Sequence, residues 1–290
     1  AEKECADFAM ATDPDADRLG VALRTGKGDY VLLNGNQTLV LLMSYQLTRW
    51  AELGKITGKE FVVKTIVTSM MPDTIAEHYG VKCYNCLTGF KYIAKIIREQ
   101  EGKTKYIGGG EESFGYLPGD FVRDKDGVAA ITLVAEAAAW ARETMGITLY
   151  EWLQQLYVKY GFFREGLVNV VRKGKDGAAE IQQMMVDYRQ NPPKSILGSP
   201  VVKILDYKTL EEIDIKTGER KAIEGIDEKS NVLQWFTEDG TKVSVRPSGT
   251  EPKIKFYFGV KAPLACVEDF ERVERELDEK IAAIAKELKL

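Results

Sequence analysis

The sequence is poor in histidine and cysteine, has no long apolar run and carries no excess of positive charge. One histidine and four cysteines occur in 290 residues. No stretch approaches the ~20 apolar residues of a membrane-spanning helix, and the first residues carry mixed charge rather than a secretion signal. The formal net charge is −4, which disfavours a role in binding nucleic acid or an anionic membrane. We therefore expect a cytoplasmic protein with no nucleic-acid or membrane partner.

The cysteines do not complete a metal or redox motif. Cys83 and Cys86 have CxxC spacing, but a zinc site requires two further ligands and the only histidine is His78. A thioredoxin-like site places its first cysteine at a helix start, whereas VKCYNC is typical of a strand. We expect both cysteines to be structural and reduced, as in a cytoplasmic protein.

The composition is that of a globular protein. Hydrophobic residues make up 44% and charged residues 29% of a length that suffices for about two domains. The chain has no initiator methionine and reaches an apolar strand, FAMAT, within ten residues. We therefore expect that it is part of a longer polypeptide.

Up to about residue 160, apolar strands alternate with amphipathic helices. A hairpin-like segment starts with Phe8–Thr12, and the first helix has Asn34 or Asn36 as candidate cap and ends at Gly54. Wholly apolar strands that alternate with helices predict an α/β unit with a buried sheet. Further strands are predicted over residues 61–69, 81–84 and 105–110, and further helices over 72–80, 90–102, 127–145 and 147–161.

Beyond a boundary near residues 157–163, strands dominate. The turn at Asp239-Gly240 predicts a hairpin. The pattern predicts a mostly antiparallel α+β unit after the α/β unit. Its strands are predicted over residues 163–171, 201–208, 232–245 and 253–262, and its helices over 176–193 and 264–290.

The first loop with candidate binding residues is ATDPDADR, directly after a predicted strand. Asp13, Asp15 and Asp17 alternate, so several oxygens can converge on one hard cation such as Mg²⁺. An EF-hand is excluded because Arg18 and Arg24 stand where its glycine and glutamate are required. An exposed acidic turn is the alternative. The adjacent Arg18 favours a ligand that bridges metal and cation, such as a phosphate.

The second loop is GGGEESFGY, at the end of a predicted strand. Glycines allow a ligand to approach the backbone, and Glu111 with Glu112 can accept hydrogen bonds from sugar hydroxyls. A solvated turn is the alternative. The segment Arg123–Gly127 then places cations and acids just before a helix, whose amides can help to hold an anion.

The third loop is RPSGTEPK, between strands of the second unit. A guanidinium, two hydroxyls and a glycine within five residues form a candidate phosphate cradle that needs no helix. A plain turn is the alternative. The GxxxxGK[ST] pattern is absent, which disfavours a nucleotide kinase.

The order of the three loops is more specific than any one of them. The sequence resembles the α-D-phosphohexomutase superfamily, whose hallmarks are loops like ATDPDADR, GEESFGY and RPSGTEP. TGFKYI, FVRDKDG and the EES version of the second loop look like the phosphoglucomutase branch. The resemblance covers nearly the whole chain. It implies the end of domain 2 in residues 1–34, an α/β domain 3 in 35–157 and an α+β domain 4 in 158–290 that is similar to the TATA-binding-protein fold.

The resemblance also implies the roles of individual residues. Asp13, Asp15 and Asp17 would hold Mg²⁺, and Arg18 would lie beside the phosphoryl group in transfer. Hexose 1- and 6-phosphates would interconvert, with glucose 1,6-bisphosphate as intermediate and activator. The residues expected to line the substrate site are Lys91, Glu111, Ser113, Arg123 and Lys125, with Arg246, Ser248, Gly249 and Thr250 for the distal phosphate.

The chain departs from the family pattern at the nucleophile. The phosphoserine of the family lies in a loop like T(A/C)SHNP, and no such string occurs here. We expect the chain alone to be inactive, with the missing N-terminal domains of the same polypeptide as its partners. Alternatives are a non-catalytic sugar-phosphate-binding module, phosphomannomutase or phosphopentomutase specificity in the whole enzyme, and a metal-dependent phosphatase, which the absence of a DxDx(T/V) arrangement disfavours.

Overall fold

The computed structural model describes residues 1–172, 174–249 and 251–290, and of residues 174 and 175 the backbone alone. The chain divides into two compact units, Ala1–Gly161 with Leu264–Val267 and Phe162–Pro263 with Glu268–Leu290. Within the described ranges, no helix has the length and apolar character needed to cross a bilayer.

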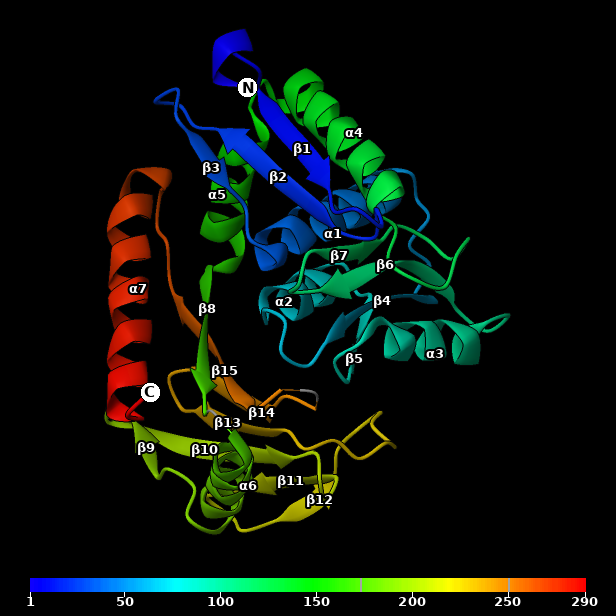
Figure 1. Ribbon diagram of the computed structural model, residues 1–290. Helices are drawn as coiled ribbons and strands as arrows, with labels where there is room; N and C mark the ends of the chain where they lie inside the picture. Colours follow the sequence, from blue (N-terminus) through cyan, green and yellow to red (C-terminus); the bar gives the residue numbers. More distant parts are fainter. Residues whose placement is uncertain (173, 250) are drawn as a thin grey trace. The chain divides into compact units, whose positions relative to one another are not determined.

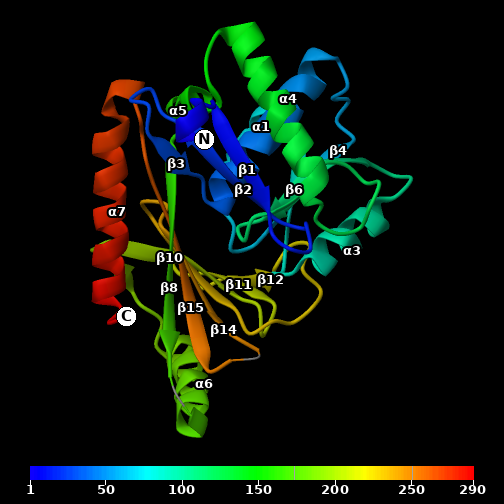
Figure 2. The same cartoon turned by 45° about the horizontal axis from the view of Figure 1, so that its top comes forward.

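The first unit begins with a three-stranded antiparallel sheet of order β1-β2-β3, which follows a short 3₁₀ turn, Glu2–Glu4. Leu19, Val21 and Leu23 of β2 are buried. Helix α4 lies against β1 and β2 (Figures 1 and 2). Because Thr12 pairs with Leu19, the six residues between them are held at the end of a rigid hairpin. The strands are β1 (Phe8–Thr12), β2 (Leu19–Arg24) and β3 (Tyr30–Leu32).

A second sheet of order β5-β4-β6-β7 forms the α/β part of the unit. Strand β4 pairs in parallel with β5 and β6, whereas β7 returns antiparallel to β6. Phe61 and Val63 of β4 face α3 in an apolar core, so the next residue, Lys64, points to the opposite face, toward α2. The strands are β4 (Glu60–Thr65), β5 (Lys82–Cys86), β6 (Lys105–Glu111) and β7 (Gly115–Leu117).

Helices α1, α4 and α5 of the first unit begin at side-chain caps, whereas α2 and α3 have none. Asn34 and Gln37 form a capping box at the start of α1, and Thr148 and Glu151 form another at the start of α5. The Asp126 side chain caps α4 through the amide of Ala129 at 2.9 Å. The helices are α1 (Gly35–Glu52), α2 (Met71–His78), α3 (Phe90–Gln100), α4 (Gly127–Met145) and α5 (Leu149–Tyr160).

The second unit is an antiparallel sheet of order β12-β11-β10-β13-β14-β15-β8, with β9 paired to β10. Helix α7 packs along β8 and β15 (Figures 1 and 2). Its strands are β8 (Phe162–Val171), β9 (Ser195–Ile196), β10 (Ser199–Asp206), β11 (Glu211–Asp214), β12 (Arg220–Ala222), β13 (Leu233–Thr237), β14 (Lys242–Pro247) and β15 (Lys253–Ala262), and its helices are α6 (Gly174–Gln190) and α7 (Phe270–Glu287).

The fold class predicted from the sequence, an α/β part followed by an α+β part, is confirmed, but three details were wrong. Strand β4 ends at Thr65, because the amide of Thr68 bonds the Thr65 carbonyl at 3.1 Å and turns the chain. The last helix begins at Phe270 after a 3₁₀ turn, Val267–Asp269, rather than at residue 264. The short strands β7, β9, β11 and β12 were not predicted, since two to four residues show no clear period.

Candidate functional site

The acidic loop between β1 and β2 folds around one carboxylate. Oδ1 of Asp13 accepts hydrogen bonds from the backbone amides of Asp17, at 3.2 Å, and Arg18, at 3.1 Å. Ala16 adopts a left-handed φ of 57°, which lets the chain reverse within the loop. Desolvation opposes the charge of Asp13, but the two amides and the nearby Arg18 guanidinium outweigh it, so the pKa of Asp13 is lowered. The loop is therefore built around an ionised carboxylate.

The same loop brings three carboxylates together. Asp13, Asp15 and Asp17 each offer an oxygen within 4.8 Å of the other two. Oδ1 of Asp17 is buried and accepts no hydrogen bond from the part of the chain that the structure describes. Nε of Arg18 lies 3.8 Å from this oxygen, too far for a hydrogen bond. A buried carboxylate oxygen without a donor is costly, and Mg²⁺ prefers such ligands. The arrangement thus fits a hard divalent cation.

Lys125 approaches this cluster from the segment before α4. Its ammonium lies 2.6 Å from Oδ2 of Asp17 and 3.4 Å from Oδ1 of Asp124. Burial disfavours the charge of Lys125, but the bond to Asp17 and the nearby carboxylates outweigh this, so the pKa of Lys125 is raised. A permanent cation therefore lies beside the three carboxylates.

Backbone hydrogen bonds join the acidic loop to the β6–β7 hairpin and to the start of α4. The amide of Leu19 bonds the Phe114 carbonyl at 3.1 Å, and the amide of Gly127 bonds the Ala16 carbonyl at 3.0 Å. A Cβ on Gly127 would lie 2.7 Å from that same carbonyl oxygen, so this close approach requires glycine. The two loops and the Lys125 segment thus form one connected surface of the first unit.

Glu111 ends β6 on this surface and is 8% exposed. Burial, helped by the charge of Glu112, raises the pKa of Glu111 against the opposing effects of a Ser113 hydrogen bond and the charges of Lys125 and Arg18. Glu111, Ser113, Lys125 and Arg18 therefore share one electrostatic environment. A buried acceptor flanked by a hydroxyl and cations can hold polar hydroxyl groups.

The three glycines before Glu111 pack closely against other parts of the first unit, which was not predicted. A Cβ on Gly109 would lie 2.2 Å from the Val63 carbonyl oxygen, and one on Gly110 would lie 2.2 Å from the Gly115 carbonyl oxygen. A Cβ on Gly108 would meet the side chain of Gln46. The glycines are required because the protein's own atoms pack directly against β6.

Lys91 and Arg123 make their contacts away from the acidic loop. Lys91 is exposed, with its ammonium 4.7 Å from the centre of the Tyr92 ring. Arg123 is also exposed, donates a hydrogen bond to the Asp120 carbonyl and lies 3.6 Å from a Glu101 carboxylate oxygen. The structure thus brings Asp13, Asp15, Asp17, Arg18, Glu111, Ser113 and Lys125 together, and Lys91 and Arg123 do not join their contacts.

The third predicted loop connects β14 and β15 in the second unit. The amide of Ser248 bonds the Lys253 carbonyl at 2.8 Å, and the Ser248 hydroxyl accepts from the amide of Glu251 at 3.3 Å. Gly249 is exposed, Arg246 is half-buried on β14, and Thr250 lies outside the described residues. Ser248, Gly249, Glu251 and Pro252 line a hollow of about 400 Å³ together with Ala178, Ile181 and Gln182 of α6. The contribution of α6 was not predicted.

The four cysteines are free thiols. Cys83 and Cys86 lie three positions apart on β5, so their side chains point to opposite faces of the sheet. Burial raises the pKa of Cys86 to about 12, and burial together with the Asp73 carboxylate raises the pKa of Cys83 well above its usual value. Neither thiol is activated, which agrees with a structural role.

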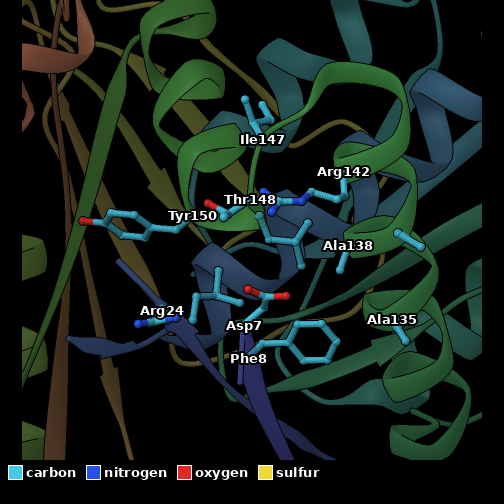
Figure 3. A pocket seen from close by; sticks show the side chains of 12 residues that line it. Asp7, Phe8, Arg24, Ala135, Ala138, Arg142, Ile147, Thr148 and Tyr150 are labelled. Atoms are coloured by element: carbon cyan, nitrogen blue, oxygen red, sulfur yellow. The ribbon is translucent and has the colours of Figure 1, made fainter. Parts of the chain in front are cut away.

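A separate pocket of about 280 Å³ opens in the first unit (Figure 3). Phe8 of β1 and alanines of α4 give it an apolar side, and its charged groups come from Asp7, Arg24 and Arg142. None of the residues predicted to bind metal or substrate lines it. It is therefore distinct from the loops described above.

Solved structures share this architecture. The parafusin phosphoglucomutase of Paramecium, in its open form, matches 96% of this chain and 46% of its own chain, with a TM-score of 0.60 and 16% identity. A phosphoglucomutase/phosphomannomutase family protein of Burkholderia thailandensis matches 95% of this chain and 47% of its own, with a TM-score of 0.56 and 15% identity. At this identity the similarity establishes the fold alone, which is that of the phosphohexomutase class.

Sequence comparison then gives the family. Residues 34–160 match the model for phosphoglucomutase/phosphomannomutase alpha/beta/alpha domain III, and residues 167–288 match the model for the C-terminal domain. A phosphoglucomutase of Staphylococcus aureus strain N315 is 36% identical over 278 residues, which cover 96% of this chain and 48% of that protein. The chain belongs to the phosphoglucomutase/phosphomannomutase family and spans about half the length of the curated relatives it matches.

Proposed function

We propose that this chain supplies the metal-, sugar- and phosphate-binding loops of a phosphoglucomutase-like enzyme that interconverts hexose 1-phosphate and hexose 6-phosphate. The observation that carries the proposal is the buried Oδ1 of Asp17, which has no hydrogen-bond donor among the described residues and lies within a cluster of three carboxylates. Lys125 connects this cluster to the buried Glu111, because it contacts Asp17 and lies with Glu111 beside Gly115. A cation site suits a phosphorylated sugar when fixed positive charge and groups that accept hydrogen bonds from sugar hydroxyls lie beside it. A cytoplasmic location is part of the proposal.

Within this proposal, Asp13, Asp15 and Asp17 hold Mg²⁺, which when bound neutralises charge on a phosphoryl group in transfer. Arg18 and Lys125 add fixed positive charge beside that group. Glu111 accepts hydrogen bonds from ring hydroxyls, and the Ser113 hydroxyl donates to them or accepts from them. These groups are present before the sugar arrives, so little reorganisation is required on binding.

The loop between β14 and β15 holds the phosphate that is not reacting, through Arg246, Ser248 and Gly249. The same proposal assigns Thr250, which lies outside the described residues, to this loop. Lys91 and Arg123 are assigned to the substrate site as well, and both must change their contacts to reach it, because they now face Tyr92 and Glu101. The domain boundaries at residues 34 and 157 remain part of the proposal.

The proposed reaction requires a phosphoserine outside this chain. Its phosphoryl group passes to the free hydroxyl of the hexose phosphate and forms the 1,6-bisphosphate, and the other phosphoryl group then returns to the serine. Because the chain has no serine in a T(A/C)SHNP-like setting, we expect it to bind sugar phosphate without catalysis.

The test is conversion of glucose 1-phosphate to glucose 6-phosphate with Mg²⁺ and glucose 1,6-bisphosphate, by this chain and by a longer polypeptide that contains it. Activity in the longer protein alone, lost on Asp15→Asn and retained on Asp124→Asn, is the expected result. A longer protein inert toward hexose phosphates would overturn the proposal. Hydrolysis of a simple phosphomonoester by the chain alone would instead favour a phosphatase.

A further inference from the structure

Glu111 and Glu112 are adjacent, yet their side chains serve different surroundings. The Glu111 carboxylate lies beside Gly115, where it shares space with the Lys125 side chain. Glu112 turns toward the end of β4, and its Oε2 accepts hydrogen bonds from the hydroxyls of Thr65, at 3.0 Å, and Thr68, at 3.3 Å. One carboxylate thus belongs to the candidate site, whereas the other bonds the protein itself.

The two threonines form a buried platform for Glu112. Both have an exposed fraction of 0%, and their hydroxyl oxygens lie 2.7 Å apart. Two hydroxyl protons are available for these three contacts, so at least one of the two threonines donates to the Glu112 carboxylate. Hydrogen bonds from buried hydroxyls to an ionised carboxylate are stronger than those between neutral groups. The Glu112 side chain is therefore held in one direction.

The backbone of Glu112 is fixed from a second side. A Cβ on Gly35, the first residue of α1, would lie 2.0 Å from the Glu112 carbonyl oxygen and 2.6 Å from the amide nitrogen of Phe114. The next residue of the helix, Asn36, accepts a hydrogen bond from the amide of Ser69 at 2.8 Å. The end of β4, the start of α1 and the hairpin turn are thus packed as one block.

We propose that Glu112 is a positioning residue for sugar recognition: by bonding Thr65 and Thr68 it fixes the turn so that Glu111 and Ser113 meet the hydroxyls of a hexose phosphate. This inference rests on the proposed function. The hydrogen bonds of Glu112 to Thr65 and Thr68 hold the β6–β7 turn within the first unit. The phosphate loop between β14 and β15 belongs to the other unit. Loss of these hydrogen bonds therefore weakens recognition of the sugar and leaves recognition of phosphate unchanged.

The test compares wild-type chain with Glu112→Ala, Thr65→Val/Thr68→Val and the conservative Thr65→Ser. Affinities for glucose 6-phosphate and for inorganic phosphate are measured by titration calorimetry with Mg²⁺. Amide exchange in residues 111–117 is followed without ligand. We expect Glu112→Ala and the double valine variant to weaken glucose 6-phosphate binding by about tenfold, the scale of one charged hydrogen bond, with inorganic phosphate binding unchanged. Exchange in the turn becomes faster, and Thr65→Ser behaves as wild type.

A wild-type chain that binds glucose 6-phosphate, with variants that bind it equally well or with unchanged exchange in the turn, would overturn the inference alone. Equal losses for sugar phosphate and inorganic phosphate would also overturn it, because they indicate general damage to the fold. A wild-type chain that binds inorganic phosphate and no sugar phosphate would overturn the proposed function, and with it the purpose assigned to Glu112.

Discussion

The ammonium of Lys125 lies 2.6 Å from Oδ2 of Asp17, on the same carboxylate whose Oδ1 has no hydrogen-bond partner among the described residues. The Lys125 side chain is 13% exposed, so its charge is only partly screened by water. One oxygen of Asp17 thus has a close ammonium partner, while the other has only the Arg18 guanidinium, 3.8 Å away, and no hydrogen bond.

Replacing Lys125 with methionine should tighten Mg²⁺ binding to the chain. The substitution removes a positive charge close to the carboxylates, and at a partly buried site such a charge is worth about 1 kcal/mol, or roughly fivefold in affinity. Calorimetric titration with Mg²⁺ measures the change, with Lys91→Met as a control that should have no effect. Unchanged or weaker binding in Lys125→Met would show that the cation does not bind at Asp17.

Lys64 and Asp73 form an ion pair at 3.0 Å, and removing one partner should cost much more stability than removing the other. Lys64 is 2% exposed and Asp73 is 38% exposed. Asp73→Asn leaves a buried ammonium without its counter-charge and should cost about 3 kcal/mol of unfolding free energy, whereas Lys64→Met leaves a carboxylate that water can reach and should cost clearly less. Urea denaturation measures both.

A matched control for this pair is Asp120→Asn, because the Lys105–Asp120 pair at 2.9 Å is exposed on both sides. Its loss should cost less than about 1 kcal/mol. Equal effects of Asp73→Asn and Asp120→Asn would contradict the assignment of a buried charge to Lys64.

Gly109→Ala should separate β4 from β6. The added methyl group would lie 2.2 Å from the Val63 carbonyl oxygen, a backbone atom that cannot rotate away. We expect a loss of about 3 kcal/mol or failure to fold. Gly26→Ala is the control, since no atom lies within 4 Å of its added Cβ. A Gly109→Ala variant with wild-type melting temperature would show that β4 and β6 tolerate a wider spacing.

Asp239 should contribute to the acid sensitivity of the second unit. Burial opposes its charge, but hydrogen bonds from Lys280, Thr237 and Thr241 outweigh burial and lower the pKa of Asp239. Because the folded state then binds the proton less well, the stabilisation is present above the unfolded pKa near 3.8 and is lost as pH falls below it. Lys280 lies on α7, so the pair ties that helix to the β13–β14 turn.

Asp239→Asn should therefore lower stability at pH 7 and reduce the further loss between pH 4 and pH 2. Since Asp239 is 39% exposed, solvent screening keeps the effect at about 1 kcal/mol or less. Urea denaturation at several pH values checks this, with the exposed Glu238→Gln as control. An unchanged pH dependence in Asp239→Asn would refute the contribution.

Local patterns in the sequence were sufficient for most of the fold. The cap of α1 and the Asp239-Gly240 hairpin involve residues a few positions apart, so their signals are complete within a short window. The end of β4 was missed because Ile66 and Val67 continue the apolar run although the backbone has already turned.

The candidate site was only partly predictable, for a related reason. Alternating aspartates in one loop predict their own convergence, and the structure places their oxygens together. The partners of Glu112 are 47 and 44 positions away, so no local pattern identifies them, although threonines at the end of an apolar strand were the available signal. The close packing of the β6 glycines against Val63 and Gly115 was not predicted, because the sequence does not reveal which backbone segment lies beside a strand.

Because the cysteines differ in burial, the rate of thiol labelling reports on the opening of the first unit. Cys5 and Cys266 are exposed and should be modified at once by a thiol reagent, whereas Cys86 is buried and can react only when β5 detaches from its sheet. Residues 162–263 and 268–290 contain no cysteine. The slow phase of labelling therefore times the opening of the α/β part alone, even while the strand-rich part stays closed.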